Sequence, residues 1–280
     1  MSPDAVQALV ARCLAEPSFL AASLAAEAEQ APGGEGLGAG DAAGVLGAER
    51  LERLGLFRGF ITKIKHNALR RVVPLTLDLL ACLRLEVDVF AACSAEYVIL
   101  RAAGPLSPDR QLAFFEDQLA RFLKTQPGAV REGVLALLAH EACAWRVGME
   151  TGPAAAAPGA VAPCGGLRVQ GYGVDVLALA DALATGSFDP AADWPRRACR
   201  LAYRRTPDGL AVAEIDGFSA FVLSLVDGRR DVAAITEAVA AAGLPQVSEA
   251  DVGALLAQAG GLGLVVMPAP QGEGRPCVSC

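Results

Sequence analysis

The stretch from residue 198 to 267 constrains the fold most, because it holds two strand-like segments, a tight turn and three short helical segments in that order. The strand-like segments are 198–205 and 210–216. The turn between them reads Thr-Pro-Asp-Gly, in which proline fixes φ and glycine accepts a positive φ. The helical segments are 218–226, 232–242 and 249–259. This order is typical of a small winged-helix module, a type of domain that usually binds another molecule.

The rest of the chain is expected to be largely helical. The length of 280 residues suits about two domains, and 53% of the residues are apolar although only 5% are aromatic. A core of this composition is rich in Ala and Leu, which are strong helix formers. We therefore expect an α+β protein that is mostly α, with an N-terminal helical domain followed by the small winged-helix domain.

Changes in composition along the chain predict its domain boundaries. Apolar residues recur at helical spacing near the N-terminus, and a Gly/Ala-rich stretch without any period follows. A second stretch, rich in Pro, Ala and Gly, separates the helical block from the mixed region. The predicted parts are N-terminal helices over 1–30, a flexible loop over 31–47, a helical domain over 48–150, a linker over 151–166, the winged-helix domain over 167–268 and a disordered tail over 269–280.

The sequence contains no complete catalytic motif. Its histidines are His66 and His140; the second begins the zinc-protease pattern H-E-x-x-H, but Ala144 stands where the next histidine is required. The tail ends in a C-x-x-C at Cys277 and Cys280, a spacing at which two thiolates can share a metal or form a redox pair. Alone, this pair supplies half of a zinc site. We expect no enzyme, metal or cofactor in this chain, and the tail is interpreted either as chemically incidental or as a thiol site.

Charge distinguishes between the two ligands that a winged helix can bind. The net charge is −7, and the segment 249–259 holds Glu249 and Asp251 but no Lys or Arg. Such a helix would repel the DNA backbone, whose neutralisation drives binding, so no nucleic acid is expected. An extended peptide that pairs with the strand edge at 210–216 is the better interpretation. The expected groove residues, each of which is alternatively ordinary core or surface, are Leu210, Val212, Glu214, Asp251, Leu255 and Gln258.

A basic segment over 49–71 stands out against this acidic background. It is interpreted either as a solvated helix face or as a docking surface for an acidic partner. The residues assigned to a partner interface are Arg58, Lys63, Lys65, Asn67 and Arg70.

The sequence also predicts the compartment. It contains no uncharged apolar run of about 18 residues, and no basic segment opens its N-terminus. We therefore expect a cytoplasmic protein without a membrane partner, in which the cysteines are reduced.

One short motif resembles a known family. Residues 225–235 read Leu-Val-Asp-Gly-Arg-Arg-Asp-Val-Ala-Ala-Ile. This motif, within the order of strands and helices around it, resembles the PqqD-type recognition element of peptide-modification pathways, whose signature is L-x-D-G-x-x-(T/S)-V-x-x-I. Asp231 replaces the hydroxyl residue of that signature and is an equally good helix N-cap.

The helical block is similar to the helical domain of the partner proteins that accompany multinuclear non-haem iron-dependent oxidases (MNIOs). The similarity lies in residues 57–80 and 106–123, and Val73 departs from it because an aromatic residue is usual there. The matching positions are Asn67, Pro74, Ser107 and Leu123.

Together these resemblances imply a non-catalytic accessory subunit of a heterodimer. It would bind a ribosomally synthesised precursor peptide and present it to the MNIO, which would hold the iron and perform the modification. Two alternatives remain open: a winged-helix transcription regulator, and a thiol- or metal-handling protein that uses Cys277 and Cys280.

Overall fold

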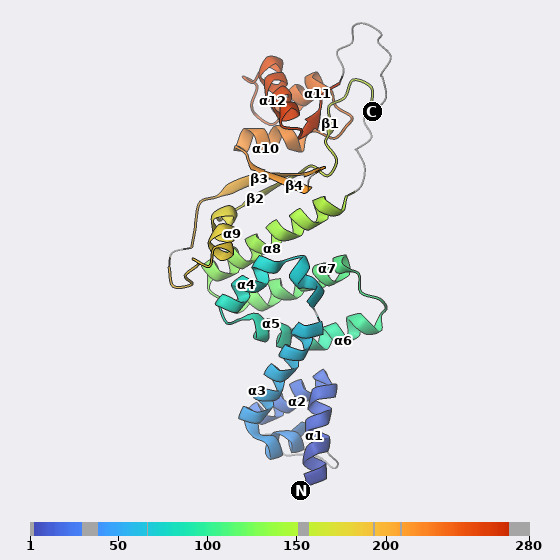
Figure 1. Ribbon diagram of the computed structural model, residues 1–280, viewed down its shortest axis with the longest axis vertical. Helices are drawn as coiled ribbons and strands as arrows, with labels where there is room; N and C mark the ends of the chain where they lie inside the picture. Colours follow the sequence, from blue (N-terminus) through green and yellow to red (C-terminus); the bar gives the residue numbers. More distant parts are fainter. Residues whose placement is uncertain are drawn as a thin grey trace. The chain divides into compact units, whose positions relative to one another are not determined.

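The computed structural model describes residues 3–29, 39–65, 67–150, 157–192, 194–207 and 209–268. The chain forms two compact units, which we describe separately. The helical unit holds residues 1–141 and 177–194, and the mixed unit holds residues 142–176 and 195–280. Helices dominate the described residues, and small antiparallel sheets accompany them (Figure 1). This confirms the expected α+β, mostly α class, and the winged-helix assignment stays a prediction.

The helical unit begins with three helices around a small core of their own. They are α1 (Pro3–Ala15), α2 (Pro17–Glu29) and α3 (Ala39–Lys65). The flexible loop predicted for 31–47 is therefore wrong for residues 39–47, which are helical, while residues 30–38 lie outside the described part. Leu46 explains the difference, because it packs into this core beside Leu51 and is 6% exposed. Gly47, at φ 71°, kinks the helix just after it.

Shorter helices complete the helical unit. They are η1 (Asn67–Arg71), α4 (Pro74–Cys82), α5 (Glu86–Ala92), α6 (Ser94–Ala102), α7 (Pro108–Phe122), η2 (Leu123–Thr125), the first part of α8 (Gly128–Met149) and most of α9 (Val176–Ala184). Helix α7 begins where the sequence predicts, since the Ser107 hydroxyl accepts a hydrogen bond from the Arg110 N–H. Helices α3 and α5 approach closely at Gly59, where an added Cβ would stand 2.5 Å from the Val87 carbonyl oxygen.

The mixed unit contains a three-stranded antiparallel sheet and three helices. The strands lie in the order β2 (Arg168–Tyr172), β3 (Cys199–Thr206) and β4 (Gly209–Glu214). The helices that follow are α10 (Gly217–Ser224), α11 (Val232–Ala241) and α12 (Glu249–Gly261). Asp216, Asp231 and Ser248 each accept hydrogen bonds from backbone N–H groups in the first turn of one helix. The sequence thus predicted β3, β4 and these three helices to within about two residues at each end.

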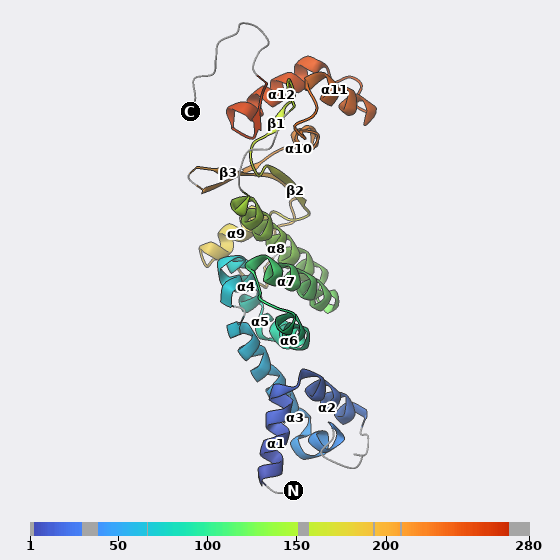
Figure 2. The same cartoon turned by 90° about the vertical axis from the view of Figure 1, so that its right-hand side faces the viewer.

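The three helices cover one face of the sheet (Figures 1 and 2). Ala202 in β3 and Val169 in β2 lie on this face and pack with the helices. The buried centre of this core comprises Val222, Ile235, Val239, Val252 and Leu256.

The other face of the sheet is also covered. Tyr203 is fully buried there, and its hydroxyl lies 2.6 Å from that of Tyr172. Arg205 donates to the Glu150 carbonyl at 2.6 Å, which places the end of α8 against this face. The sheet is therefore the middle layer of the mixed unit.

The linker predicted for 151–166 is wrong for residues 157–166, and residues 151–156 lie outside the described part. Val161 is fully buried in the core of the mixed unit, and its N–H donates to the Arg230 carbonyl at 2.9 Å. Strand β1 (Ala162–Pro163) pairs with β5 (Val265–Val266). The compositional signal misled because a segment rich in Ala and Pro can still bury its apolar side chains. The division of the chain instead falls within α8, between Glu141 and Ala142.

No single helix among the described residues has the length and apolar character to cross a membrane. One bent pair, residues 5–14 and 19–26, meets those criteria only when its two helices are taken together.

Candidate peptide-binding edge of the sheet

Strand β4 lies at the edge of the three-stranded sheet. In the described part of the chain it pairs with β3 alone. The hairpin register sets Leu210 opposite Arg205, Val212 opposite Tyr203 and Glu214 opposite Leu201. The sequence predicted both this hairpin and the position of its outer strand.

The backbone of β4 alternates between groups that bond to β3 and groups that face outward. The Ile215 N–H donates to the Arg200 carbonyl at 2.9 Å, so these two opposite residues belong to the hydrogen-bonded class of antiparallel pairs. By alternation, the N–H and C=O groups of Leu210, Val212 and Glu214 point away from β3. No backbone–backbone bond to these groups occurs among the described residues outside the β3–β4 ladder. The edge thus offers three N–H donors and three C=O acceptors to an added strand.

The side chains of the expected groove residues do not share one face. Val212 stands opposite Tyr203 and therefore lies on the sheet face turned toward α8, together with Leu210 and Glu214. Helix α12, which carries the other three expected residues, packs on the opposite face. On that face β4 presents Ala211 and Ala213, because successive side chains of a strand point to opposite sides. The strand edge is available to a peptide. However, the expected side chains of β4 and those of α12 lie on opposite faces of the sheet and do not line one groove.

Glu214 is engaged within the chain. Arg197 forms an ion pair with both of its carboxylate oxygens and contacts the Asp175 carboxylate at 2.8 Å. The hydrogen bonds from Arg197 lower the pKa of Glu214. This arrangement ties the end of β4 to the residue that precedes α9.

Asp251 also has a local role. Its carboxylate accepts from the Ser248 N–H at 3.0 Å, and its own N–H donates to the Ser248 hydroxyl, which completes a capping box at the start of α12. Leu255 is partly buried against the core of the mixed unit, and Gln258 is exposed. Of the three α12 residues, Asp251 and Gln258 are therefore on the surface, and Asp251 is engaged in the helix cap.

The residues expected at a partner interface form internal contacts in the helical unit. Arg58 is buried and donates to the Cys13 carbonyl at 2.8 Å. Lys63 and Arg70 both pair with the carboxylate of Glu86, which is only 5% exposed. Asn67 is exposed, and the side chain of Lys65 lies outside the described part. The basic segment is therefore not a free cationic surface at Arg58, Lys63 and Arg70.

Glu141 marks a second buried carboxylate that the sequence does not reveal as structural. It accepts hydrogen bonds from the Leu75 N–H, the Thr76 N–H and the Thr76 hydroxyl, at 2.8, 2.8 and 2.7 Å. These contacts cap helix α4, whose N-cap Val73 has no side-chain acceptor. Burial raises the pKa of Glu141, although the hydrogen bonds oppose this shift. The residue that resembles part of a zinc motif thus holds a helix end.

Metal binding has no support within the part of the chain that the structure describes. No three His, Cys, Asp or Glu side chains there are grouped so that they could hold an ion. Cys277, Cys280 and His66 lie outside it, so the thiol interpretation of the tail is not addressed.

Comparisons with known proteins add no relative. No protein-family model matches the chain, and no curated protein matches it.

Sequence reasoning missed three residues that shape these sites: Arg197, Glu86 and Glu141. Each acts through a partner more than 15 positions away, and local patterns carry no signal for such pairs. The edge at β4, in contrast, was expected from the winged-helix interpretation of the hairpin, and β2 pairs on the far side of β3.

Proposed function

We propose that this chain is the non-catalytic, PqqD-like partner subunit of an MNIO. It binds a ribosomally synthesised precursor peptide and presents it to the oxidase for post-translational modification. The iron belongs to the oxidase, so this chain supplies recognition and no redox chemistry. Neither nucleic acid nor a membrane is a partner in this proposal.

The observation that carries the proposal is the edge of β4, which pairs with β3 alone among the described residues. Three alternate residues offer outward backbone N–H and C=O groups, and the first of them, Leu210, directly follows the hairpin turn. A peptide can add as a fourth strand and gain affinity from main-chain hydrogen bonds without any special side chain. Recognition then depends little on Val212 or Glu214 as chemical groups.

Two features of the mixed unit bear on which peptides fit, the short side chains of β4 and the acidic start of α12. Ala211 and Ala213 are short, so they leave room for the peptide's side chains on the face that carries α12. Glu249 and Asp251 make the first turn of α12 acidic. This charge suits a peptide with basic residues near that turn and disfavours a phosphate backbone.

The test is isothermal titration calorimetry of the purified chain with the precursor peptide encoded beside its gene. A Val212→Pro variant removes one outward N–H from the edge and should weaken binding at least tenfold. The control is Gly171→Pro on the opposite edge strand, where residues 169 and 171 face outward by the same alternation; it should leave peptide affinity unchanged. Equal binding by both variants would place the peptide elsewhere, and salt-dependent DNA binding by the wild type would favour a transcription regulator.

A further inference from the structure

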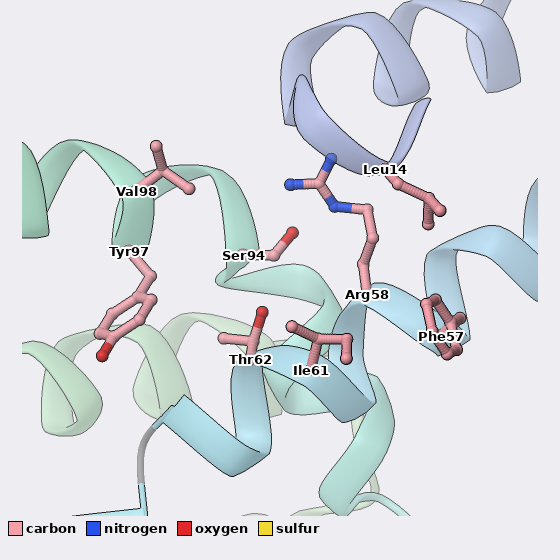
Figure 3. Close-up of a pocket in the computed structure, with 8 residues that line it drawn as sticks. All are labelled: Leu14, Phe57, Arg58, Ile61, Thr62, Ser94, Tyr97 and Val98. Carbon is pink, nitrogen blue, oxygen red and sulfur yellow. The ribbon is translucent and has the colours of Figure 1, made fainter. Parts of the chain in front are cut away.

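A pocket of about 260 Å³ lies between helices α1, α3 and α6 of the helical unit (Figure 3). One part of its wall is apolar and the other part is polar. Apolar side chains from α3 and α6 form one part, and they include Phe57, Ile61 and Val98. The polar part consists of Arg58, Thr62 and Ser94.

The polar side chains of this pocket can donate hydrogen bonds into it. Thr62 and Ser94 are 6% and 8% exposed as whole residues, and both line the pocket beside Arg58. Figure 3 shows both hydroxyls and the Arg58 guanidinium directed toward the same space. Hydroxyl and guanidinium groups both donate hydrogen bonds, so one acceptor placed in this space suits all three side chains.

Arg58 supplies the charge. Arg58 is 7% exposed, and its guanidinium donates to the Cys13 carbonyl, one of the last carbonyls of α1. No carboxylate pairs with it in the described part of the chain. Burial lowers the pKa of Arg58, yet guanidinium stays protonated in proteins. A buried cation of this kind is stabilised by an anion, and a planar carboxylate matches its N–H groups.

An exposed apolar surface continues outward from the pocket. On α3, Leu56, Phe57, Phe60 and Ile64 fall within an arc of about 100°, and each is between 46% and 55% exposed. On α6, Val98 and Ile99 are 48% and 69% exposed. Exposed apolar side chains gathered in this way are typical of an interaction surface. A small carboxylate bound in the pocket would leave most of this apolar surface exposed to water. The occupant is therefore larger than the pocket.

We propose that this surface, formed by Leu56, Phe57, Phe60, Ile64, Val98 and Ile99 around the pocket, docks a partner protein that inserts an Asp or Glu side chain flanked by apolar residues. The inserted carboxylate accepts from Arg58, Thr62 and Ser94, and the apolar residues cover the exposed faces of α3 and α6. The identity of the partner rests on the proposed function: it is the MNIO subunit. The interface is then mainly apolar with one buried charge pair, instead of the cationic surface that the sequence predicts.

The test measures binding of the purified, iron-loaded oxidase encoded beside the gene, by biolayer interferometry. Ser94→Asp places a carboxylate in the pocket, where it occupies Arg58 and repels the incoming one; affinity should fall at least a hundredfold. Ser94→Asn is the matched control, with the same shape and no charge, and should lose less than tenfold. Phe60→Ser should lose at least tenfold, whereas Leu262→Ser, an exposed apolar residue of the mixed unit, should change nothing.

We do not expect Ser94→Asp to weaken binding by unfolding the chain, because an Asp in the first turn of a helix is favourable. Circular dichroism and peptide titration of each variant check that point. Wild-type affinity in both Ser94→Asp and Phe60→Ser overturns the inference and leaves the proposed function standing. Failure of the wild type to bind both the oxidase and the precursor peptide overturns the proposed function and with it the occupant named here.

Discussion

Val212 in β4 stands directly opposite Tyr203 in β3, on the sheet face turned away from α12. This pairing separates the side chains of the edge strand from those of the helix that was expected to share a groove with them. The outward N–H and C=O groups of β4 are therefore the groups to which a peptide can bind, whatever its side chains. A recognition surface of this kind tolerates varied peptide sequences, because main-chain groups are the same in every residue.

The buried tyrosine pair should couple the two strands that carry it. Tyr172→Phe or Tyr203→Phe leaves one buried hydroxyl without its partner and should cost on the order of 1–2 kcal/mol of unfolding free energy. The double variant removes both hydroxyls and should cost less than the sum of the two. Urea denaturation of the four proteins in a double-mutant cycle measures this coupling. Strictly additive losses would contradict a direct bond between the hydroxyls.

The close approach of α3 and α5 predicts opposite effects for two glycines on one helix. Gly59→Ala should lower unfolding free energy by roughly 1–3 kcal/mol, because the new methyl group meets the Val87 carbonyl. Gly55→Ala meets nothing within 4 Å and should raise it by up to about 1 kcal/mol. Thermal unfolding followed by circular dichroism distinguishes them. Similar effects from both substitutions would mean that α3 and α5 do not pack at Gly59.

Glu141 should make stability depend on pH. Its pKa is raised in the folded protein, so folding favours the protonated form. Its contribution is complete below the ordinary value of 4.5 and decreases as pH rises from there through the raised folded value. Glu141→Gln should flatten this slope in urea titrations across that range, while Glu132→Gln, exposed on the same helix, should not.

Removing the cap altogether tests the structural role of the same residue. Glu141→Ala leaves the Leu75 and Thr76 N–H groups without acceptors and should cost on the order of 2 kcal/mol. Hydrogen exchange should show faster opening of the first turn of α4 than in the wild type. Unchanged protection there would argue against capping by Glu141.

Arg197 should control the order of the β4 edge. Arg197→Ala releases Glu214 and Asp175 together, so the β4 amides should exchange faster with solvent. The depressed pKa of Glu214 means that its ion pair contributes above the ordinary value of 4.5 and is lost as pH falls through the folded pKa. Exchange rates of the β4 amides in the wild type should therefore approach those of Arg197→Ala at low pH. Arg196→Ala, exposed next to it, is the control.

Local sequence patterns predicted most of the secondary structure. The hairpin around residues 206–209, the caps at Ser107 and Asp231 and the helices of the mixed unit follow from short-range rules, because turns and caps involve residues within a few positions of one another. The edge position of β4 was expected from the winged-helix interpretation, and the tertiary structure decides it because β2 pairs with β3.

The predictions failed where distant residues decide. The segments 39–47 and 157–166 read as a loop and a linker, but Leu46 and Val161 are buried by residues far along the chain. The basic residues read as a docking surface, but Glu86 neutralises Lys63 and Arg70 from more than 15 positions away. Composition describes a segment alone and contains no information about its neighbours in space.

By itself, the sequence determined the helical character of the chain, the strand order of its hairpin and the absence of a complete catalytic motif. Tertiary structure alone decided which face each β4 side chain occupies relative to α12, which charges are already paired, and that α3 and α6 expose an apolar surface around a buried arginine. The physical reason is range: hydrogen bonds of turns and caps are set within a few residues, whereas burial and charge pairing depend on which segments meet after the chain has folded.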